Sequence, residues 1–360
     1  MSFANETILY VDLNKLEENF NYLKAKLDPK TKIIGVVKAF AYGHGDVKVS
    51  EKLAKIGVYA LWVSDFEEGL ILRKSNIKTK IIVANPGIKS YSKIIKYKLD
   101  IIVFNHKTLD LYCAKKHPVN IHVKFNTGMN RYGFNISDIE EVVLKIKNNP
   151  HLNLISICSH LAESCNKNTL SYTKNQLEQF NTIFKKFEAG IGKVIQKHIL
   201  NSQGVLNFSN YQLDAVRLGL GLYGSNKDKN LKQIGRLNSV VSQIRHLSAG
   251  DSVGYGREFI AKKDMSIAVI PVGYADGLNR RLGNSVGNVF INNFSCTIIG
   301  EVSMDSCMVD ITGFSIKEGD IVEIFGDLLP VNEIAKKINT IPYEIYSSLN
   351  RRIKRVYSDS

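Results

Sequence analysis

Lys38 stands at a position where a lysine side chain could take part in a chemical reaction. It follows the short apolar run Ile33-Ile34-Gly35-Val36-Val37, which is typical of a parallel strand covered on both faces. An ammonium at the end of such a strand gives up water, which is costly unless its charge is lost or used. A poorly solvated lysine is suited to forming a Schiff base with an aldehyde. The alternative is a lysine whose stem lies along the strand and whose ammonium reaches solvent.

Further polar side chains stand at the ends of later apolar runs, among them His160, Ser202 and Arg217. If these runs are neighbouring parallel strands, their carboxyl ends lie on one face of the fold, where barrel enzymes carry their active sites. Polar residues are partly expected there because loops begin at strand ends. A lysine, a histidine and an arginine at three different strand ends nevertheless predict one shared pocket. The remaining strand ends carry Asp65, Asn85, Asn105, Asn126 and Asn201.

Residues 217–224 contain three glycines in the spacing G-x-G-x-x-G. A dinucleotide-binding loop is one interpretation, but that fingerprint opens a helix, whereas residues 225–230 are typical of a loop. A phosphate cradle after the last strands of a barrel fits better, with the backbone amides of Gly219 and Leu220 close to phosphate oxygens. Ser202 can add a hydroxyl group to this cradle.

A reactive lysine, a phosphate cradle and an arginine on one barrel face indicate pyridoxal 5′-phosphate as the cofactor. Lys38 would bond to the aldehyde carbon, and the Tyr42 phenol would join the glycines at the phosphate. Arg217 would face the ring nitrogen. Because arginine is a permanent cation and donor, it disfavours protonation of that nitrogen and leaves the ring a weaker electron sink. Such a ring suits proton exchange at the substrate Cα better than transamination.

Inversion at Cα needs a proton-transferring group on each face of the reacting centre, and Lys38 can serve one face. The candidate for the opposite face is Tyr255, which stands between two glycines in a predicted turn. A phenol with its usual pKa of about 10 is a poor base, so a cation such as Arg217 or Arg131 would have to lower that pKa. The alternative is a structural tyrosine in a turn.

Eight apolar runs, alternating with amphipathic stretches, would position these residues. Strands that alternate with helices imply parallel pairing and right-handed crossovers, and eight such units fit a closed (β/α)8 barrel of the TIM type. An open doubly wound sheet is the alternative. The eight runs are 32–39, 60–65, 80–85, 100–105, 120–126, 153–160, 195–202 and 215–220.

Beyond the predicted barrel, assigned to residues 13–232, the pattern changes to short β-rich runs with glycine-containing turns. This change predicts a smaller, mostly-β C-terminal domain over 233–360. Residues 1–12 include a strand that we expect to pair with the β domain, and a last helix is predicted over 331–337. The β-rich runs are 239–244, 266–272, 287–291, 296–300, 308–311 and 320–325.

Composition argues against several classes of protein. No apolar run reaches the roughly 18 residues of a membrane span, and the N-terminus resembles no secretory signal, so we expect a cytoplasmic protein without a membrane partner. The net charge of +14 comes largely from scattered lysines, so it predicts attraction of anionic ligands and no nucleic-acid partner. Five cysteines without a C-x-x-C pair predict reduced thiols, and we expect no metal.

Over nearly the whole chain, these segments resemble bacterial alanine racemase, a fold-type III pyridoxal-phosphate enzyme. The segment 36–45 is similar to the family's cofactor-lysine signature, which implies that Lys38 holds the cofactor and Tyr42 contacts its phosphate. The resemblance further implies a ring contact for His160, a ring-nitrogen contact for Arg217, and phosphate contacts for Ser202, Gly219 and Leu220.

The resemblance also assigns the substrate side of the site. Arg131, in the segment 123–133, would assist binding of the substrate carboxylate, which the backbone amide of Met304 would contact. Tyr255 would be the second catalytic base and would come from the partner subunit, which implies a head-to-tail homodimer with composite sites. The implied activity is interconversion of L-alanine and D-alanine, supplying D-alanine for peptidoglycan.

The chain departs from the family pattern at three positions. Phe40 replaces a common asparagine, Asn126 replaces a frequent aspartate, and Arg351 replaces a tyrosine that several members carry near the phosphate. Lys124 matches a lysine that is carbamylated in some members, and the sequence leaves its state here open.

Three alternative functions would share the fold or the cofactor with an alanine racemase. A serine or broader-specificity racemase would use the same chemistry on another amino acid. A non-catalytic pyridoxal-phosphate carrier would resemble only the first 230 residues. A decarboxylase of the same barrel-plus-β family would usually carry a glycine triplet and a catalytic cysteine, whereas Cys296 and Cys307 lie outside any recognisable active-site motif.

Overall fold

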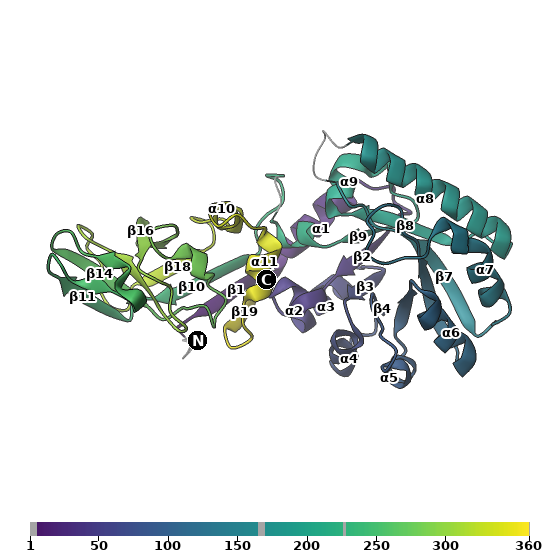
Figure 1. Cartoon of the computed structure of the whole chain (residues 1–360), viewed down its shortest axis with the longest axis horizontal. Helices are drawn as coiled ribbons and strands as arrows, with labels where there is room; N and C mark the ends of the chain where they lie inside the picture. The colour runs from purple at the N-terminus through teal and green to yellow at the C-terminus, as the bar shows by residue number, and fades with distance from the viewer. Residues whose placement is uncertain (1–5, 165–169, 226–227, 360) are drawn as a thin grey trace. The chain divides into compact units, whose positions relative to one another are not determined.

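A computed structural model describes residues 6–164, 170–225 and 228–359. The chain divides into two compact units (Figure 1). The barrel unit comprises residues 19–41 and 46–222, and the β unit comprises the chain up to residue 18, residues 42–45 and the chain from residue 223 onward. The domain boundaries at residues 12 and 232 stay a prediction.

In the barrel unit, eight parallel strands close into a barrel with helices around it (Figure 1). The strands follow one another in sequence order, and β2 closes the barrel against β9, with Ile34 opposite Arg217. The predicted (β/α)8 barrel is confirmed, and the open doubly wound sheet is wrong. The strands are β2 (Lys32–Val36), β3 (Ala60–Val63), β4 (Lys80–Val83), β5 (Asp100–Val103), β6 (Val119–Lys124), β7 (Leu152–Cys158), β8 (Gln196–Asn201) and β9 (Ala215–Leu218).

The barrel strands are short apolar runs because both of their faces are buried, one by the barrel interior and one by helices. Ile34, Ile82 and Ile102 pack with Ala60 and Cys158 in one buried cluster, so the interior is a packed core. The helices before and between the strands are α1 (Leu13–Lys24), α2 (Lys38–Tyr42), α3 (Asp46–Lys55), α4 (Phe66–Lys74), α5 (Tyr91–Lys96), α6 (His106–Lys115), α7 (Ile139–Lys147), α8 (Leu170–Ile191) and α9 (Ser202–Phe208), with the 3-10 helices η1 (Ile136–Asp138), η3 (Ser209–Tyr211) and η4 (Leu220–Tyr223).

Three of the polar residues at strand ends begin the helix that follows. The side chains of Asp65, Asn105 and Asn201 each accept a hydrogen bond from the backbone N–H three residues further on, at the starts of α4, α6 and α9. Such caps satisfy backbone N–H groups that have no partner in the first helical turn. Part of the polar pattern at the strand ends therefore reflects helix capping.

The β unit is built on a nine-stranded sheet in the order β11-β14-β17-β16-β15-β18-β10-β1-β19. The N-terminal strand β1 pairs antiparallel with β10 and parallel with β19. The elements are β1 (Ile8–Asp12), β10 (Gly235–Val240), β11 (Gln243–Leu247), β12 (Ser252–Val253), η5 (Tyr255–Arg257), β13 (Phe259–Ile260), β14 (Met265–Ile270), η6 (Arg280–Leu282), β15 (Asn288–Ile291), β16 (Phe294–Ile299), β17 (Cys307–Asp310), β18 (Ile321–Phe325), α10 (Val331–Lys337), α11 (Pro342–Ser348) and β19 (Lys354–Ser358).

One β-rich run of the sequence, 239–244, is wrong as a single strand. It covers the end of β10 and the start of β11, and Val241 and Ser242 belong to neither. The Val241 N–H donates to Asp320 O and the Ser242 N–H donates to Val269 O, so the chain changes its partner between these two residues.

Within the described ranges, no helix has the length and apolarity needed to cross a bilayer. The same residues hold no group of three or more histidine, cysteine, aspartate or glutamate side chains that could bind a metal ion. Cys113, Cys158, Cys296 and Cys307 are free thiols, and Cys165 lies outside the described residues.

Candidate functional site

Lys38 lies two residues after the end of β2 and is followed directly by a left-handed backbone turn. Residues 39–42 have φ angles between 50° and 55°, although none of them is glycine. Each non-glycine residue in this region costs about 1–2 kcal/mol, and strain of this kind gathers at functional sites. Gly43 continues the turn at a φ of 79°, where a Cβ atom would lie 2.0 Å from Tyr346 O. The turn therefore holds Lys38 in one specific backbone geometry.

Lys38 belongs to a cluster of cationic side chains in the barrel unit. Burial, followed by the nearby Arg131 guanidinium, lowers the pKa of Lys38, and Glu68 partly opposes this shift. Burial, together with the cations Arg217, Arg131 and Lys38, lowers the pKa of Lys124 to about 8, and the nearby Cys158 partly opposes this shift. We call Lys38, Lys124, Arg131 and Arg217 the cation cluster. Such a cluster favours ligands that carry phosphate or carboxylate groups.

The depressed pKa of Lys124 predicts a pH-dependent stability. Below pH 8 the folded protein holds a poorly solvated ammonium, whereas between about 8 and 10.5 the folded state sheds that proton before the unfolded chain does. The stability cost of Lys124 is therefore full below pH 8 and falls as the pH rises. We expect Lys124→Met to raise the melting temperature more at about pH 7 than at about pH 9.5.

The measurement is a pair of thermal melts of the variant and the wild type at each pH, in buffer kept free of bicarbonate so that Lys124 stays unmodified. The exposed lysine Lys93, replaced by methionine, is the control and should show no such pH-dependent gain. An equal gain at both pH values for Lys124→Met would contradict the interpretation.

Arg217, on β9, is buried and surrounded by neutral acceptors. Its guanidinium donates to Ser159 O at 2.6 Å, to Ile199 O at 3.0 Å and to His160 Nδ1 at 2.9 Å. Burial first, and then the charge of Arg217, hold the pKa of His160 well below its ordinary value, so His160 is neutral at pH 7. Among the described residues no carboxylate forms an ion pair with Arg217, so its charge is available to a ligand.

A chain of hydrogen bonds behind Arg217 was missed by the sequence analysis. Arg217 Nη1 donates to His198 Nδ1, so His198 Nε2 carries the proton that points to Ser156 Oγ, 3.2 Å away. Ser156 in turn donates to His122 Nδ1 at 2.6 Å, and His122 Nε2 lies 3.6 Å from Asp100. Three polar residues at buried positions of neighbouring strands, His122, Ser156 and His198, were the signal that could have revealed this chain.

The predicted phosphate cradle forms a compact set of backbone and hydroxyl groups in the barrel unit. Ser202 Oγ accepts hydrogen bonds from Gly219 N at 2.8 Å and from Gly221 N at 3.2 Å, and Leu220 lies between these two amides. A Cβ atom on Gly221 would lie 2.9 Å from Ser202 Cβ, so only glycine permits this close approach. The amides and the hydroxyl thus converge without a side chain between them.

The loop that carries Arg131 is organised by Asn126. Asn126 Oδ1 accepts hydrogen bonds from Gly128 N at 3.1 Å and Asn130 N at 2.9 Å, and its Nδ2 donates to Asn130 Oδ1 at 2.8 Å. An aspartate in this place could accept the backbone bonds but could not donate to Asn130. Asn126 therefore serves a local structural role.

The other predicted site residues lie in the β unit. Tyr255 begins η5 between Gly254 (φ 75°) and Gly256 (φ 68°), and its side chain is 71 % exposed. Met304 is 54 % exposed, whereas Tyr42 is buried and its ring packs against Tyr223 with centroids 4.8 Å apart. Of the predicted residues, the barrel unit thus groups Lys38, Arg131, His160, Ser202, Arg217, Gly219 and Leu220.

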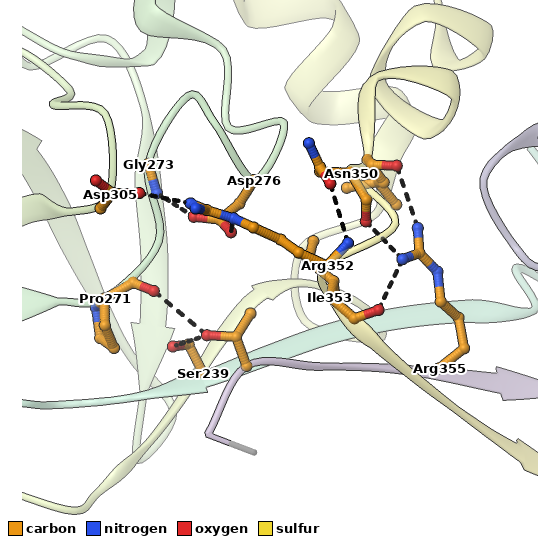
Figure 2. Close-up of polar contacts among 11 residues, drawn as sticks. Ser239, Pro271, Gly273, Asp276, Asp305, Asn350, Arg352, Ile353 and Arg355 are labelled. Atoms are coloured by element: carbon orange, nitrogen blue, oxygen red, sulfur yellow. Dashed lines mark hydrogen bonds and ion pairs between the residues drawn. The ribbon is translucent and has the colours of Figure 1, made fainter.

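The segment around Met304 is held by its backbone and by an arginine clamp. Tyr274 N donates to Ser303 O at 3.0 Å and Ala275 N to Met304 O at 2.9 Å. Figure 2 shows Arg352 reaching both Asp276 and Asp305, each at 2.7 Å. Arg352 therefore links the segment 303–305 to the segment 273–277, and both Arg352 and its neighbour Arg351 are exposed.

Two family profiles match most of the chain. The profile described as Alanine racemase, N-terminal domain, matches residues 11–227, and the profile described as Alanine racemase, C-terminal domain, matches residues 234–357. Among curated proteins, the chain is 33 % identical to "Alanine racemase 2" of Caldanaerobacter subterraneus over 98 % of this chain and 94 % of that protein. It is 35 % identical to the alanine racemase of Helicobacter acinonychis over 96 % of this chain and 97 % of that protein.

Comparison with solved structures also finds alanine racemases. The chain is similar to the alanine racemase of Bartonella henselae with covalently bound pyridoxal phosphate, with a TM-score of 0.90 and 29 % identity. This match covers 98 % of the chain and 100 % of that structure.

Proposed function

This chain belongs to the alanine racemase family, a family of isomerases, and we propose that it interconverts L-alanine and D-alanine with pyridoxal 5′-phosphate as cofactor. In this proposal Lys38 and Tyr255 are the two catalytic bases. Arg131 and the backbone amide of Met304 bind the substrate carboxylate.

The arrangement within the barrel unit supports this proposal most strongly. Lys38 provides an amine whose pKa is lowered by burial, and Ser202 with the amides of Gly219 and Leu220 offers an anion cradle. Arg217 offers a buried charge to which no described carboxylate is paired. These three features fit the aldehyde, the phosphate and the ring nitrogen of pyridoxal 5′-phosphate, with His160 beside the ring.

The residues of this chain would control one proton at the substrate Cα. When bound, the cofactor withdraws electrons from Cα and so makes that proton acidic. Lys38 takes or returns the proton on one face, and Tyr255 does so on the other. Arg217, a permanent cation, keeps the ring nitrogen unprotonated, which favours return of the proton to Cα over transfer of the amino group.

The exposure of Tyr255 supports a composite site in a homodimer. Tyr255 is 71 % exposed, so its hydroxyl is accessible to a second subunit, and a phenol needs a nearby cation to lower its pKa before it can act as a base. The cation cluster of the partner subunit would supply that cation. We therefore propose a head-to-tail homodimer in which Tyr255 and Met304 of each chain complete the barrel site of the other.

The proposal includes the cellular setting of the reaction. A cytoplasmic enzyme of this activity would supply D-alanine for peptidoglycan precursors. A broader amino-acid racemase that also accepts serine, and a non-catalytic pyridoxal-phosphate carrier, are the competing functions.

Racemisation assays with alanine, serine and lysine separate these functions. We expect kcat/KM for alanine to exceed that for serine by about 10-fold or more, because an added hydroxyl must be accommodated without a partner. Equal values for alanine and serine would contradict the alanine assignment. No turnover of any of the three amino acids would favour the carrier.

A further inference from the structure

Glu68 occupies a place where a glutamate normally caps its own helix. It stands three residues after Asp65, which caps α4 and accepts a hydrogen bond from Glu68 N at 3.1 Å. This spacing is that of a capping box, in which the glutamate carboxylate returns to the backbone N–H of the capping residue. Here the carboxylate points elsewhere.

The Glu68 carboxylate joins two different strand ends. Oε1 accepts a hydrogen bond from Ala39 N at 2.7 Å, and Oε2 accepts one from Ser64 N at 2.7 Å. Ala39 N is the first backbone amide after Lys38, and Ser64 directly follows β3. Hydrogen bonds from N–H groups to a charged carboxylate are stronger than those to a neutral acceptor.

From this geometry we propose that Glu68 is a positioning residue for Lys38. The ladder between β2 and β3 runs to Val36 opposite Trp62, and the last backbone bond is from Val37 N to Trp62 O at 2.9 Å. Beyond Val37 the chain turns left-handed and leaves the ladder. The Glu68 carboxylate replaces the next ladder bond, and so it fixes the strained turn at the residue where it begins.

The charge of Glu68 acts on the same lysine. Glu68 raises the pKa of Lys38, against burial and Arg131, which lower it. The carboxylate thereby keeps the Lys38 amine both in place and protonatable, and both properties are needed by a group that must take up and return a proton.

This inference depends on the proposed function, and the test separates the two. The variants are Glu68→Gln, which keeps the size of the side chain but offers one oxygen to two N–H donors, and Glu68→Asp, which keeps the charge with a shorter reach. Glu67→Gln is the matched control, because Glu67 is the exposed neighbour on the same helix. All are studied as cofactor-loaded enzymes.

We expect Glu68→Gln to lower kcat by about 10- to 100-fold, because a small displacement of a catalytic group has effects of this size. The specific readout is the Cα-deuterium isotope effect, measured separately from L-alanine and from D-alanine. It should rise for the enantiomer whose proton Lys38 removes and not for the other. The fraction of Lys38 that borohydride reduction labels should also fall in the absence of substrate. Glu68→Asp should lie between, and Glu67→Gln should match the wild type.

Two results would overturn the inference while leaving the proposed function intact. One is wild-type kinetics and labelling in Glu68→Gln. The other is an equal change of the isotope effect for both enantiomers, which would indicate a general loss of structure. A wild-type enzyme that fails to racemise alanine would instead overturn the proposed function.

Discussion

Replacing Tyr255 with phenylalanine should lower kcat for alanine racemisation by about 10²- to 10⁴-fold, the usual contribution of a general acid or base. The tyrosine side chain is 71 % exposed, so loss of its hydroxyl should leave the melting temperature unchanged. Cofactor binding should also be kept, because every residue proposed to contact the cofactor is untouched. Polarimetry measures the loss of activity, and visible absorbance measures the bound cofactor.

The control for this variant is Tyr211→Phe, because Tyr211 is an exposed tyrosine of the barrel unit outside the proposed site. It should keep full activity. Wild-type activity in Tyr255→Phe would remove Tyr255 from the mechanism and leave one proposed base without a partner.

Replacing Lys38 with alanine should remove both the covalent attachment of the cofactor and one of the two bases. We expect kcat to fall by about 10⁴-fold or more, the upper end of the range for one general base, because two roles are lost together. Borohydride reduction followed by peptide mapping should label Lys38 in the wild type and give no label at this position in the variant.

Lys48→Ala is the control, since Lys48 is a surface lysine paired with Glu51 at 2.7 Å. It should keep both the activity and the label on Lys38. A label found mainly on another lysine of the wild type would show that Lys38 is not the attachment point.

The barrel could be predicted because its strands are buried on both faces and therefore appear as separate apolar runs. The strands of the β unit were harder to delimit, because many of them have one polar face and because residues close in sequence pair with different strands. Val240, Val241 and Ser242 belong to one predicted β-rich run, although the chain changes its hydrogen-bonding partner between Val241 and Ser242. Strand β19 was missed because residues 354–358 are largely polar, as is common for a strand at the edge of a sheet.

The candidate site was predictable where chemistry and strand position agree, as for Lys38, His160 and Arg217. A site residue could not be predicted where its sequence pattern is also typical of a common structural role. Glu68 looks like a capping-box residue, and only its contact with Ala39 N connects it to Lys38. Asp65, which the sequence shows only as a polar residue at a strand end, caps helix α4.

The central claim, that one active site combines Lys38 and Tyr255 from two different chains, is tested most directly by a hybrid dimer. Chains carrying Lys38→Ala and chains carrying Tyr255→Phe, marked with different affinity tags, are co-expressed, and the mixed dimer is purified. Each parent variant alone should keep about 1 % of the wild-type activity or less. In the proposed dimer one of the two sites regains both Lys38 and Tyr255, so we predict about half of the wild-type kcat per dimer. A hybrid as inactive as its parents would contradict the account.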